Sequence, residues 1–327
     1  MFQPDRSTDQ DIDEQANPLA LPDARDRDRQ VVRGGAITLI STLMTVVLTM
    51  GATVVLARLL TPEDFGLVAM AGILITFLGK IRKFGLVDAV IHRPDLDPRT
   101  LSGLFLSNVK LSLVIFVVAV VASPAMALLF SRGELILIIV VIATANFVHC
   151  LGTVHEGLIR RRFEFGRTVF INSTAGVLSV AVAIAAAYYG LGYWALVLQE
   201  VIREALLGLM FLCLGRWLPR PSTVDEESKA KTREMLKYGG NLSLANVVGY
   251  FGRNLDYVLV GTLSGAAALG LYHKAFRWAS FPQQQVFTPA MKVAMSKLSR
   301  LQDEQKIYRA SVRRTLMALY GMVAPLF

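Results

Sequence analysis

The sequence predicts an all-α membrane protein with many spans, and three observations indicate this fold class. Hydrophobic residues make up 54% of the chain and charged residues only 18%, and the mean hydropathy is +0.48. Eight apolar stretches each approach the roughly 20 residues that a helix needs to cross the hydrocarbon of a bilayer. Basic residues crowd into alternate connections between these stretches, which is the pattern of cytoplasmic loops in membrane proteins.

The spans are expected to be helices, because no stretch alternates apolar and polar residues as a membrane β-strand does. The predicted spans cover, in order, residues 35–57, 65–86, 106–130, 135–157, 169–189, 193–214, 239–261 and 266–291. A ninth apolar stretch begins near Leu316.

The connections predict the orientation of the chain. The first residues form a polar tail, dense in Asp and Arg between 23 and 29, which is typical of a disordered segment and not of a cleavable signal peptide. With this tail inside, the basic clusters at 160–162 and 229–237 also lie inside, whereas Arg58 and Arg132 are the basic residues of the outside connections. This bias predicts a multi-pass protein of the inner (plasma) membrane with a cytoplasmic amino terminus.

Several function classes are not supported. The net charge of +9 does not indicate nucleic-acid binding. The basic residues flank apolar segments, where they set the membrane orientation of the chain and contact lipid headgroups. Cys150 and Cys213 lie in apolar runs, so neither a disulfide framework nor a metal site is expected. Gly79-Lys80 lacks the spacing of a phosphate-binding loop. We expect no cofactor, no metal and no catalytic residues.

A weak internal repeat predicts two lobes. Phe65-Gly66-Leu67, after the first span, is matched by Leu269-Gly270-Leu271 about 204 residues later, and an even number of spans separates them. Parallel copies related by an axis along the membrane normal are an architecture of transporters. The predicted domains are a tail (1–33), a first lobe of six spans (34–214), a cytoplasmic linker (215–237), and the start of a second lobe with two spans and part of a third (238–327).

The start of the second span has a physical explanation of its own. Pro62 suits the first position of a helix, Thr61 suits its N-cap, and Glu63 and Asp64 complement the positive end of the helix dipole. We interpret this segment as a structural turn, with a substrate role as the alternative.

The chain resembles a known family through an ordered set of motifs. The most extended is Ala57-Arg58-Leu59-Leu60-Thr61-Pro62-Glu63-Asp64-Phe65-Gly66-Leu67. The others are Arg161-Arg162-Phe163-Glu164-Phe165, Gly190-Leu191-Gly192-Tyr193-Trp194-Ala195-Leu196-Val197, Asn254-Leu255-Asp256 with Gly261, Gly270-Leu271-Tyr272 with Ala275, and Ser299-Arg300-Leu301-Gln302-Asp303. This set is similar to that of bacterial oligosaccharide flippases, the polysaccharide transporters of the multidrug/oligosaccharidyl-lipid/polysaccharide exporter superfamily, over residues 31–327.

The resemblance implies a two-lobe, inverted-V transporter fold with a complete first six-helix lobe and an incomplete second lobe, because family members have more spans than this chain. It implies a flippase that moves polyprenyl-diphosphate-linked oligosaccharide across the inner membrane for capsule, exopolysaccharide or lipopolysaccharide assembly. Implied partners are membrane lipids and, in an assembly complex, a polysaccharide polymerase and glycosyltransferases.

Charged residues inside spans are costly and usually face a cavity or a partner, so they are the candidate substrate-binding residues. Arg253 and Asp256 lie in the seventh span, as a self-neutralising pair or as a cavity arginine oriented by its neighbour. The eighth span carries His273, Lys274 and Arg277 in its outer half, where they line a cavity or snorkel to headgroups.

Two further groups of charges lie on the cytoplasmic side and in the sixth span. Lys80 is a candidate for diphosphate capture at the inward mouth, with interfacial snorkelling as the alternative. Glu200, Arg203 and Glu204 are candidate gating residues that either bridge the two lobes or pair within their own helix. His149, in the fourth span, takes part in a proton relay or bonds to a neighbouring helix.

Rival functions remain open on the sequence. A cation-coupled multidrug exporter of the same superfamily is expected to have an acidic cavity, whereas the seventh and eighth spans lean basic. A membrane glycosyltransferase or polymerase is disfavoured, because it requires carboxylates near a sizeable aqueous loop and the outside loops are short. A non-transporting subunit of a polysaccharide assembly complex is a third alternative.

Overall fold

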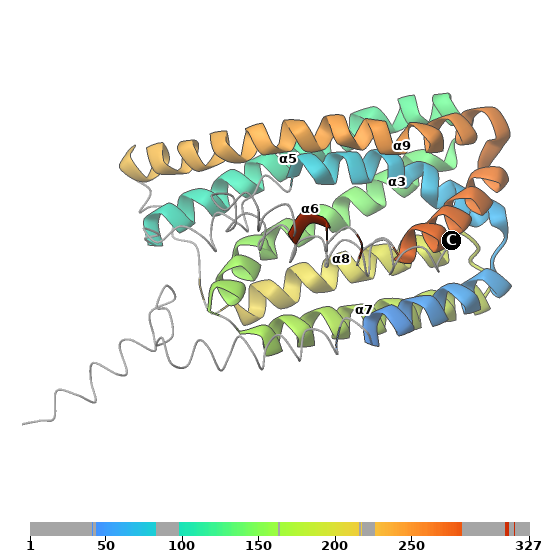
Figure 1. Ribbon diagram of the computed structural model, residues 1–327, viewed down its shortest axis with the longest axis horizontal. Coiled ribbons are helices and arrows are strands. Elements are labelled where there is room, and N and C mark those ends of the chain that lie inside the picture. Colours follow the sequence, from blue (N-terminus) through green and yellow to red (C-terminus); the bar gives the residue numbers. More distant parts are fainter. Residues whose placement is uncertain are drawn as a thin grey trace, which may run out of the picture. The chain divides into compact units, whose positions relative to one another are not determined.

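The computed structural model describes residues 41, 44–82, 98–162, 164–215, 217, 226–282, 311–313 and 317. Within these residues every regular element is a helix, so the predicted all-α class is confirmed (Figure 1). The chain divides into two compact units, Met1–Gly270 and Leu271–Phe327. Five helical stretches of the described residues are long and apolar enough to cross a membrane, namely Pro62–Gly79, Arg99–Phe130, Glu134–Arg161, Phe165–Tyr188 and Asn254–Ser280. The protein is therefore a multi-pass membrane protein.

The first unit contains most of the described helices. They are the apolar helix Met44–Leu59, α3 (Pro62–Arg82), α5 (Pro98–Phe130), α6 (Glu134–Arg161), α7 (Phe165–Tyr188), α8 (Trp194–Leu214) and the larger part of α9 (Glu226–Pro282). The predicted sixth span coincides with α8, which has 21 residues but carries three charges near its middle. Of the predicted first span, Ser41 and the residues from Met44 onward are among those described.

The start of α3 follows the predicted cap. The Asp64 backbone N–H donates to Thr61 Oγ1 at 3.3 Å, and the Thr61 backbone N–H donates to Asp64 Oδ2 at 2.8 Å. This reciprocal pair is a capping box that satisfies two otherwise orphaned donors at the helix start. The structural interpretation of Thr61 to Asp64 is confirmed.

Helix α5 begins at Pro98, eight residues before the predicted span. The added residues form helix because they pack, since Leu101 and Leu104 are fully buried and Phe105 contacts the His155 ring edge-on at 6.2 Å. Farther along, α5 exposes the apolar residues Leu113, Val114, Val117, Val118 and Val121. An exposed apolar face of this length is typical of a helix in contact with lipid.

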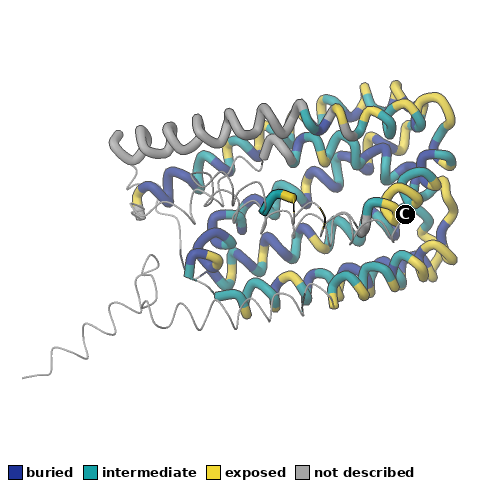
Figure 2. The backbone as a smooth tube through the Cα atoms, viewed as in Figure 1, coloured by how far each residue is buried: buried dark blue, intermediate teal, exposed yellow. Residues whose placement is uncertain are grey.

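Helix α6 is central to the first unit and packs against α3, α5, α7 and α8. Figure 2 shows buried stretches along its length, and Leu135, Ile138 and Ile139 are fully buried. Gly152 of α6 faces Gly208 of α8, and a Cβ on either glycine would overlap the backbone of the other helix. Small residues allow membrane helices to approach this closely.

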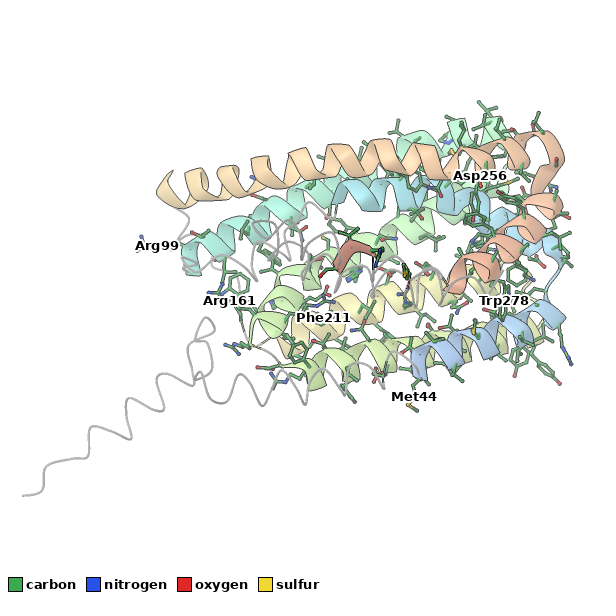
Figure 3. The ribbon with its side chains drawn as sticks, in the orientation of Figure 1. Met44, Arg99, Arg161, Phe211, Asp256 and Trp278 are labelled. Carbon is green, nitrogen blue, oxygen red and sulfur yellow. The ribbon has the colours of Figure 1, made fainter. Side chains whose placement is uncertain are left out.

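The turns that were predicted to lie outside the membrane gather at one end of this unit. Arg132, between α5 and α6, pairs with Glu63 at the start of α3 at 2.6 Å. Gly192, between α7 and α8, has φ of 56° and lies against Asp64. Arg161, which was predicted inside, lies at the opposite end, where Arg99 of α5 is also found (Figure 3).

Helix α9 contains the connection between the predicted seventh and eighth spans, at 262–265. Its backbone is helical from Glu226, which is inside the predicted linker, and it breaks at Gly265 with φ of 80° and ψ of −178°. Only glycine adopts this conformation without strain. Before the break, the Tyr250 hydroxyl donates to the Ile73 carbonyl at 2.6 Å, so α9 packs along α3.

The two copies of the internal repeat contact one another reciprocally. A Cβ on Gly66 would overlap the backbone of Ala266, and a Cβ on Gly270 would overlap the carbonyl of Pro62. Pro62 and Ala266 are the first residues of the two equivalent helices, and the repeat offset of 204 residues separates both Pro62 from Ala266 and Gly66 from Gly270. Each copy therefore places its glycine on the helix start of the other.

The second unit is described only in part. It contains the end of α9, where Tyr272 and Phe276 stack at 6.0 Å, and helical residues at 311–313 and 317. The predicted end of the eighth span, beyond Pro282, lies outside the described residues. The division into tail, lobes and linker stays a prediction.

Candidate functional site

The candidate site in the first unit is a polar cluster on α6 and α8. On α8, Arg203 Nη1 lies 3.8 Å from Glu200 Oε2 and 3.7 Å from Glu204 Oε1. These are the pairs within one helix that the sequence offered as the alternative to a bridge between lobes. The gating role of the three residues stays a prediction.

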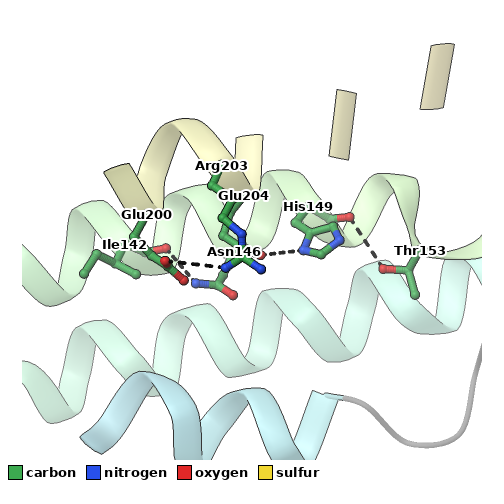
Figure 4. A network of polar contacts seen from close by, with 7 residues as sticks. All are labelled: Ile142, Asn146, His149, Thr153, Glu200, Arg203 and Glu204. Carbon is green, nitrogen blue, oxygen red and sulfur yellow. Dashed lines mark hydrogen bonds and ion pairs between the residues drawn. The ribbon is translucent and has the colours of Figure 1, made fainter. Parts of the chain in front are cut away.

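Glu204 also connects the two helices. Its Oε2 lies 2.5 Å from His149 Nδ1 on α6 (Figure 4). The His149 side chain is 15% exposed and that of Glu204 is 10% exposed. A short hydrogen bond between two shielded groups that can carry opposite charges is stronger than one in water. The sequence suggested a neighbouring helix for His149, and the structure identifies it as α8.

Local packing explains why these side chains meet. Gly152 follows His149 by one turn on α6, and Gly208 follows Glu204 by one turn on α8. The contact between the two glycines lies beside the His149–Glu204 bond, because Gly208 approaches the His149 backbone. The absence of two Cβ atoms thus allows a direct hydrogen bond between α6 and α8. The sequence signal for this contact between helices is a glycine one helical turn after each of the two polar residues.

The depth of the cluster makes it chemically unusual. Arg203 is the tenth of the 21 residues of α8, about 15 Å from its start at 1.5 Å per residue, so on the predicted sixth span it lies near the middle of the bilayer. The Arg203 side chain is nevertheless 50% exposed and that of Glu200 41%. Charges at this depth face protein or a water-filled cavity, not lipid, so we take this face of α8 as a polar lining.

The predicted substrate-binding residues are divided between the two units. Asp256 is half-buried in the first unit, whereas His273, Lys274 and Arg277 belong to the second unit. Arg253 and Lys80 lie on helical backbone, but their side chains are outside the described residues. The cavity between lobes stays a prediction.

Farther along α6, toward its end at Arg161, lies a second buried polar side chain. His155 is fully buried, with Nε2 3.0 Å from the Trp217 carbonyl and Nδ1 3.2 Å from the Leu151 carbonyl. Its ring lies 5.5 Å from that of Trp217. These contacts give His155 a structural role. Glu156 pairs separately with Arg160 at 2.6 Å.

A small cavity lies between α3, α5 and α6. Its volume is about 20 Å³, enough for about one water molecule. The polar residues of its wall are Ser112 and Asn146. Among the described residues, the buried Ser112 hydroxyl has no hydrogen-bond partner. A water molecule in this cavity would satisfy it.

Relatives of this chain include three named proteins. The chain is 24% identical to the teichuronic acid biosynthesis protein TuaB of Bacillus subtilis over 86% of its length. It is 22% identical to the lipopolysaccharide biosynthesis protein WzxC of Escherichia coli over 90% of its length. It is 24% identical to the succinoglycan biosynthesis transport protein ExoT of Rhizobium meliloti over 83% of its length.

These alignments cover 58%, 59% and 54% of the three relatives, respectively, so the chain spans less than two thirds of the length of each. No solved structure matches the chain. The family model described as polysaccharide biosynthesis protein matches residues 55–327, which include α3, the polar cluster and both repeat copies. The chain therefore belongs to the polysaccharide biosynthesis protein family of membrane proteins.

Proposed function

We propose that this protein is a flippase that moves polyprenyl-diphosphate-linked oligosaccharide from the cytoplasmic to the outer leaflet of the inner membrane. The oligosaccharide would be used for capsule, exopolysaccharide or lipopolysaccharide assembly. Family membership supports the substrate class, since one relative is named as a transport protein and the others as proteins of cell-surface polymer biosynthesis. On this proposal the protein is a transporter and performs no covalent chemistry.

The observation on the structure that carries the proposal is the reciprocal packing of the two repeat copies. Gly66 and Gly270 occupy equivalent positions, and each lies against the helix start of the other copy. Parallel repeats related by an axis along the membrane normal are a transporter architecture in which the two halves rock about a central site. A scaffold subunit has no need of such symmetry between its halves.

The proposed substrate site is cationic and lies between the two lobes. Arg253, His273, Lys274 and Arg277 supply positive charge, and Asp256 orients Arg253. An arginine binds diphosphate through two parallel hydrogen bonds. Lys80 captures the headgroup at the cytoplasmic mouth, and the polyprenyl tail stays in lipid. The positive-inside bias supports a cytoplasmic amino terminus. The proposed partners are a polysaccharide polymerase and glycosyltransferases.

Complementation tests the function directly. A strain that lacks its oligosaccharide-lipid flippase would receive either this chain or the product of its whole reading frame, and outer-leaflet lipid-linked sugar would be measured. We expect the whole product to restore the outer-leaflet pool. Failure of both versions, at verified membrane expression, would reject the flippase proposal.

Point variants test the cavity assignment separately. At equal expression, Arg253→Ala and Lys274→Ala should each lower flipping at least tenfold. Arg58→Ala is the matched control, because Arg58 is an exposed cation at the end of the helix Met44–Leu59. Full activity in both cavity variants would overturn the assignment and leave the flippase proposal intact.

A further inference from the structure

We propose that Tyr188 and Tyr189, at the end of α7, form a docking surface for phospholipid headgroups where this helix leaves the membrane. The two residues are 78% and 79% exposed. Their rings pack edge to face, with centroids 6.0 Å apart. Tyrosine suits such a position because its ring is apolar and its hydroxyl is polar, so it is enriched at the boundary between acyl chains and water. We call these two side chains the tyrosine pair.

The tyrosine pair continues the exposed face of α7. In the second half of this helix and at its C-cap, the exposed residues lie three, four or seven positions apart, so they share one side of the helix. They are Val177, Leu178, Ala181, Ala185, Tyr188 and Tyr189. The opposite side is buried, and Ala175 on it packs with Leu207 of α8. Because α7 is long enough to cross a membrane, its exposed apolar face contacts acyl chains, and the tyrosine pair lies where that contact ends.

The composition of this face indicates lipid and not a water-filled cavity. Residues 177–187 contain one polar side chain, that of Ser179, which is buried and donates to the Gly176 carbonyl at 2.9 Å. The exposed face of α8 differs, because it carries Glu200 and Arg203. Charged side chains at membrane depth face water or protein, whereas an apolar face suits lipid. The tyrosine pair therefore adjoins a lipid-facing side of the first unit.

The length of α7 places the tyrosine pair at the depth of the headgroups. Arg167, in the first turn of α7, pairs with Glu164 just before the helix. Tyr188 follows Arg167 by 21 residues, which is about 31 Å of helix and close to the roughly 30 Å thickness of the hydrocarbon. With the ion pair in one headgroup region, the tyrosine pair lies in the other. There each hydroxyl can donate to a phosphate or ester oxygen of a lipid.

The tyrosine pair is carried by a packed turn and not by a free loop. Gly190 and Gly192 have φ of 77° and 56°, which suits glycine, and they reverse the chain between α7 and α8. Gly192 lies against Asp64 of α3. Ala187, directly before the tyrosines, belongs to a buried cluster with Leu60. The two rings are thus held in position on the first unit, as a fixed contact with the lipid surface requires.

Fluorine NMR in bilayers tests this surface without any transport assay. The full chain, with 3-fluorotyrosine in place of tyrosine, would be placed in phosphatidylglycerol/phosphatidylethanolamine nanodiscs. Tyr188→Phe and Tyr189→Phe keep the rings and assign the two signals. Line broadening would be measured with lipids that carry a nitroxide at the headgroup, with lipids that carry it at the end of the acyl chain, and with a water-soluble gadolinium chelate.

We expect the headgroup nitroxide to broaden the signals of the tyrosine pair roughly threefold more than the chain-end nitroxide does, as the interfacial preference of tyrosine implies. Tyr250 is the internal control. It is 4% exposed and donates to the Ile73 carbonyl, so the headgroup nitroxide should broaden its signal far less.

Two results would overturn the proposal. Broadening of the tyrosine pair by the gadolinium chelate alone would show that the rings face water, as an aqueous ligand such as a sugar requires. Stronger broadening by the chain-end nitroxide than by the headgroup nitroxide would place the rings in the hydrocarbon.

Val177→Tyr is the matched control for depth. Val177 is 50% exposed on the same face of α7 and precedes Tyr188 by 11 residues, or about 16 Å of helix. A fluorotyrosine there lies near the middle of the bilayer, so the chain-end nitroxide should broaden it more than the headgroup nitroxide does. If position 177 and the tyrosine pair gave the same ratio of broadening, the tyrosine pair would not lie at the interface and the proposal would be wrong.

Discussion

Gly66 of α3 and Gly270 of α9 face one another. Gly66 also packs against Ala266, which follows the break at Gly265 in α9, and Gly270 packs against Pro62, the first residue of α3. A Cβ on Gly270 would approach the backbone nitrogen of Gly66 and overlap the Pro62 carbonyl. Pro62-x-x-x-Gly66 and Ala266-x-x-x-Gly270 therefore act as the two halves of one contact with small residues at its centre, which is how membrane helices pack most closely. The contact lies at the end of the unit that carries the predicted outside turns.

Alanine at either glycine should disrupt this contact. Gly66→Ala and Gly270→Ala each place a methyl group on a backbone carbonyl, which cannot move aside as a side chain does. We expect each to destabilise the protein by roughly 1–3 kcal/mol, as overpacking does. Thermal unfolding in lipid nanodiscs measures this.

The control for this prediction is Gly72→Ala, because a Cβ there meets nothing within 4 Å. Gly72 lies within α3, so alanine should be neutral or stabilising by roughly 0.5–1 kcal/mol from helix propensity. If Gly66→Ala and Gly72→Ala unfold at the same temperature, the close contact does not exist in the membrane.

The cap of α3 predicts a difference between two adjacent carboxylates. Asp64 accepts from the Thr61 backbone at 2.8 Å and completes the capping box, whereas Glu63 makes a half-exposed pair with Arg132. Asp64→Ala should cost roughly 0.5–2 kcal/mol, as loss of a cap does. Glu63→Ala should cost less, since exposed ion pairs contribute about 0–1 kcal/mol. Paired thermal melts of the two variants decide the order.

The glycine contact between α6 and α8 predicts that an alanine at Gly152 lowers the stability of the protein. A Cβ on Gly152 would overlap the Gly208 backbone, so Gly152→Ala should destabilise by roughly 1–3 kcal/mol. Gly176→Ala in α7 is the matched control, because its Cβ meets open space. Equal melting temperatures for the two variants would show that α6 and α8 are farther apart than described.

His155 predicts a distinction between ring shape and hydrogen bonding. His155→Phe keeps an aromatic ring among Phe105 and Trp217 but leaves the buried Trp217 carbonyl without its donor, at a cost of roughly 1–3 kcal/mol. His155→Gln retains a donor and should recover part of this stability. Limited proteolysis between residues 215 and 237 measures whether Trp217 has lost its contact with residue 155. Equal proteolysis of the wild type and His155→Phe would remove the anchoring role.

Features that depend on neighbouring residues were predictable from the sequence. The turn at Thr61-Pro62, the break at Gly265 and the apolar helices follow from side-chain chemistry within a few residues. The start of α5 was placed too late, because residues 98–105 are helical through their packing on α6 and not through hydrophobicity alone. Side chains that are outside the described residues, such as those of Lys80 and Arg253, leave their predicted roles open.

Features that join distant residues required the tertiary structure. The sequence supplied the alternatives for His149 and Glu204, but 55 residues separate them, and no local pattern selects one partner among several helices. The repeat offset was visible in the sequence, whereas the reciprocal contact of Gly66 and Gly270 was not, because it depends on how the two copies pack.

The sequence by itself determined that this protein lies in a membrane, that it is helical and where several helices end, since hydrophobicity and capping act locally along the chain. Only the tertiary structure decided which helices touch and which charges meet. The physical reason is that close helix packing requires the absence of a Cβ at two positions at once, as at Gly152 and Gly208. Which two glycines face one another depends on how the two helices pack, and the local sequence does not contain this information.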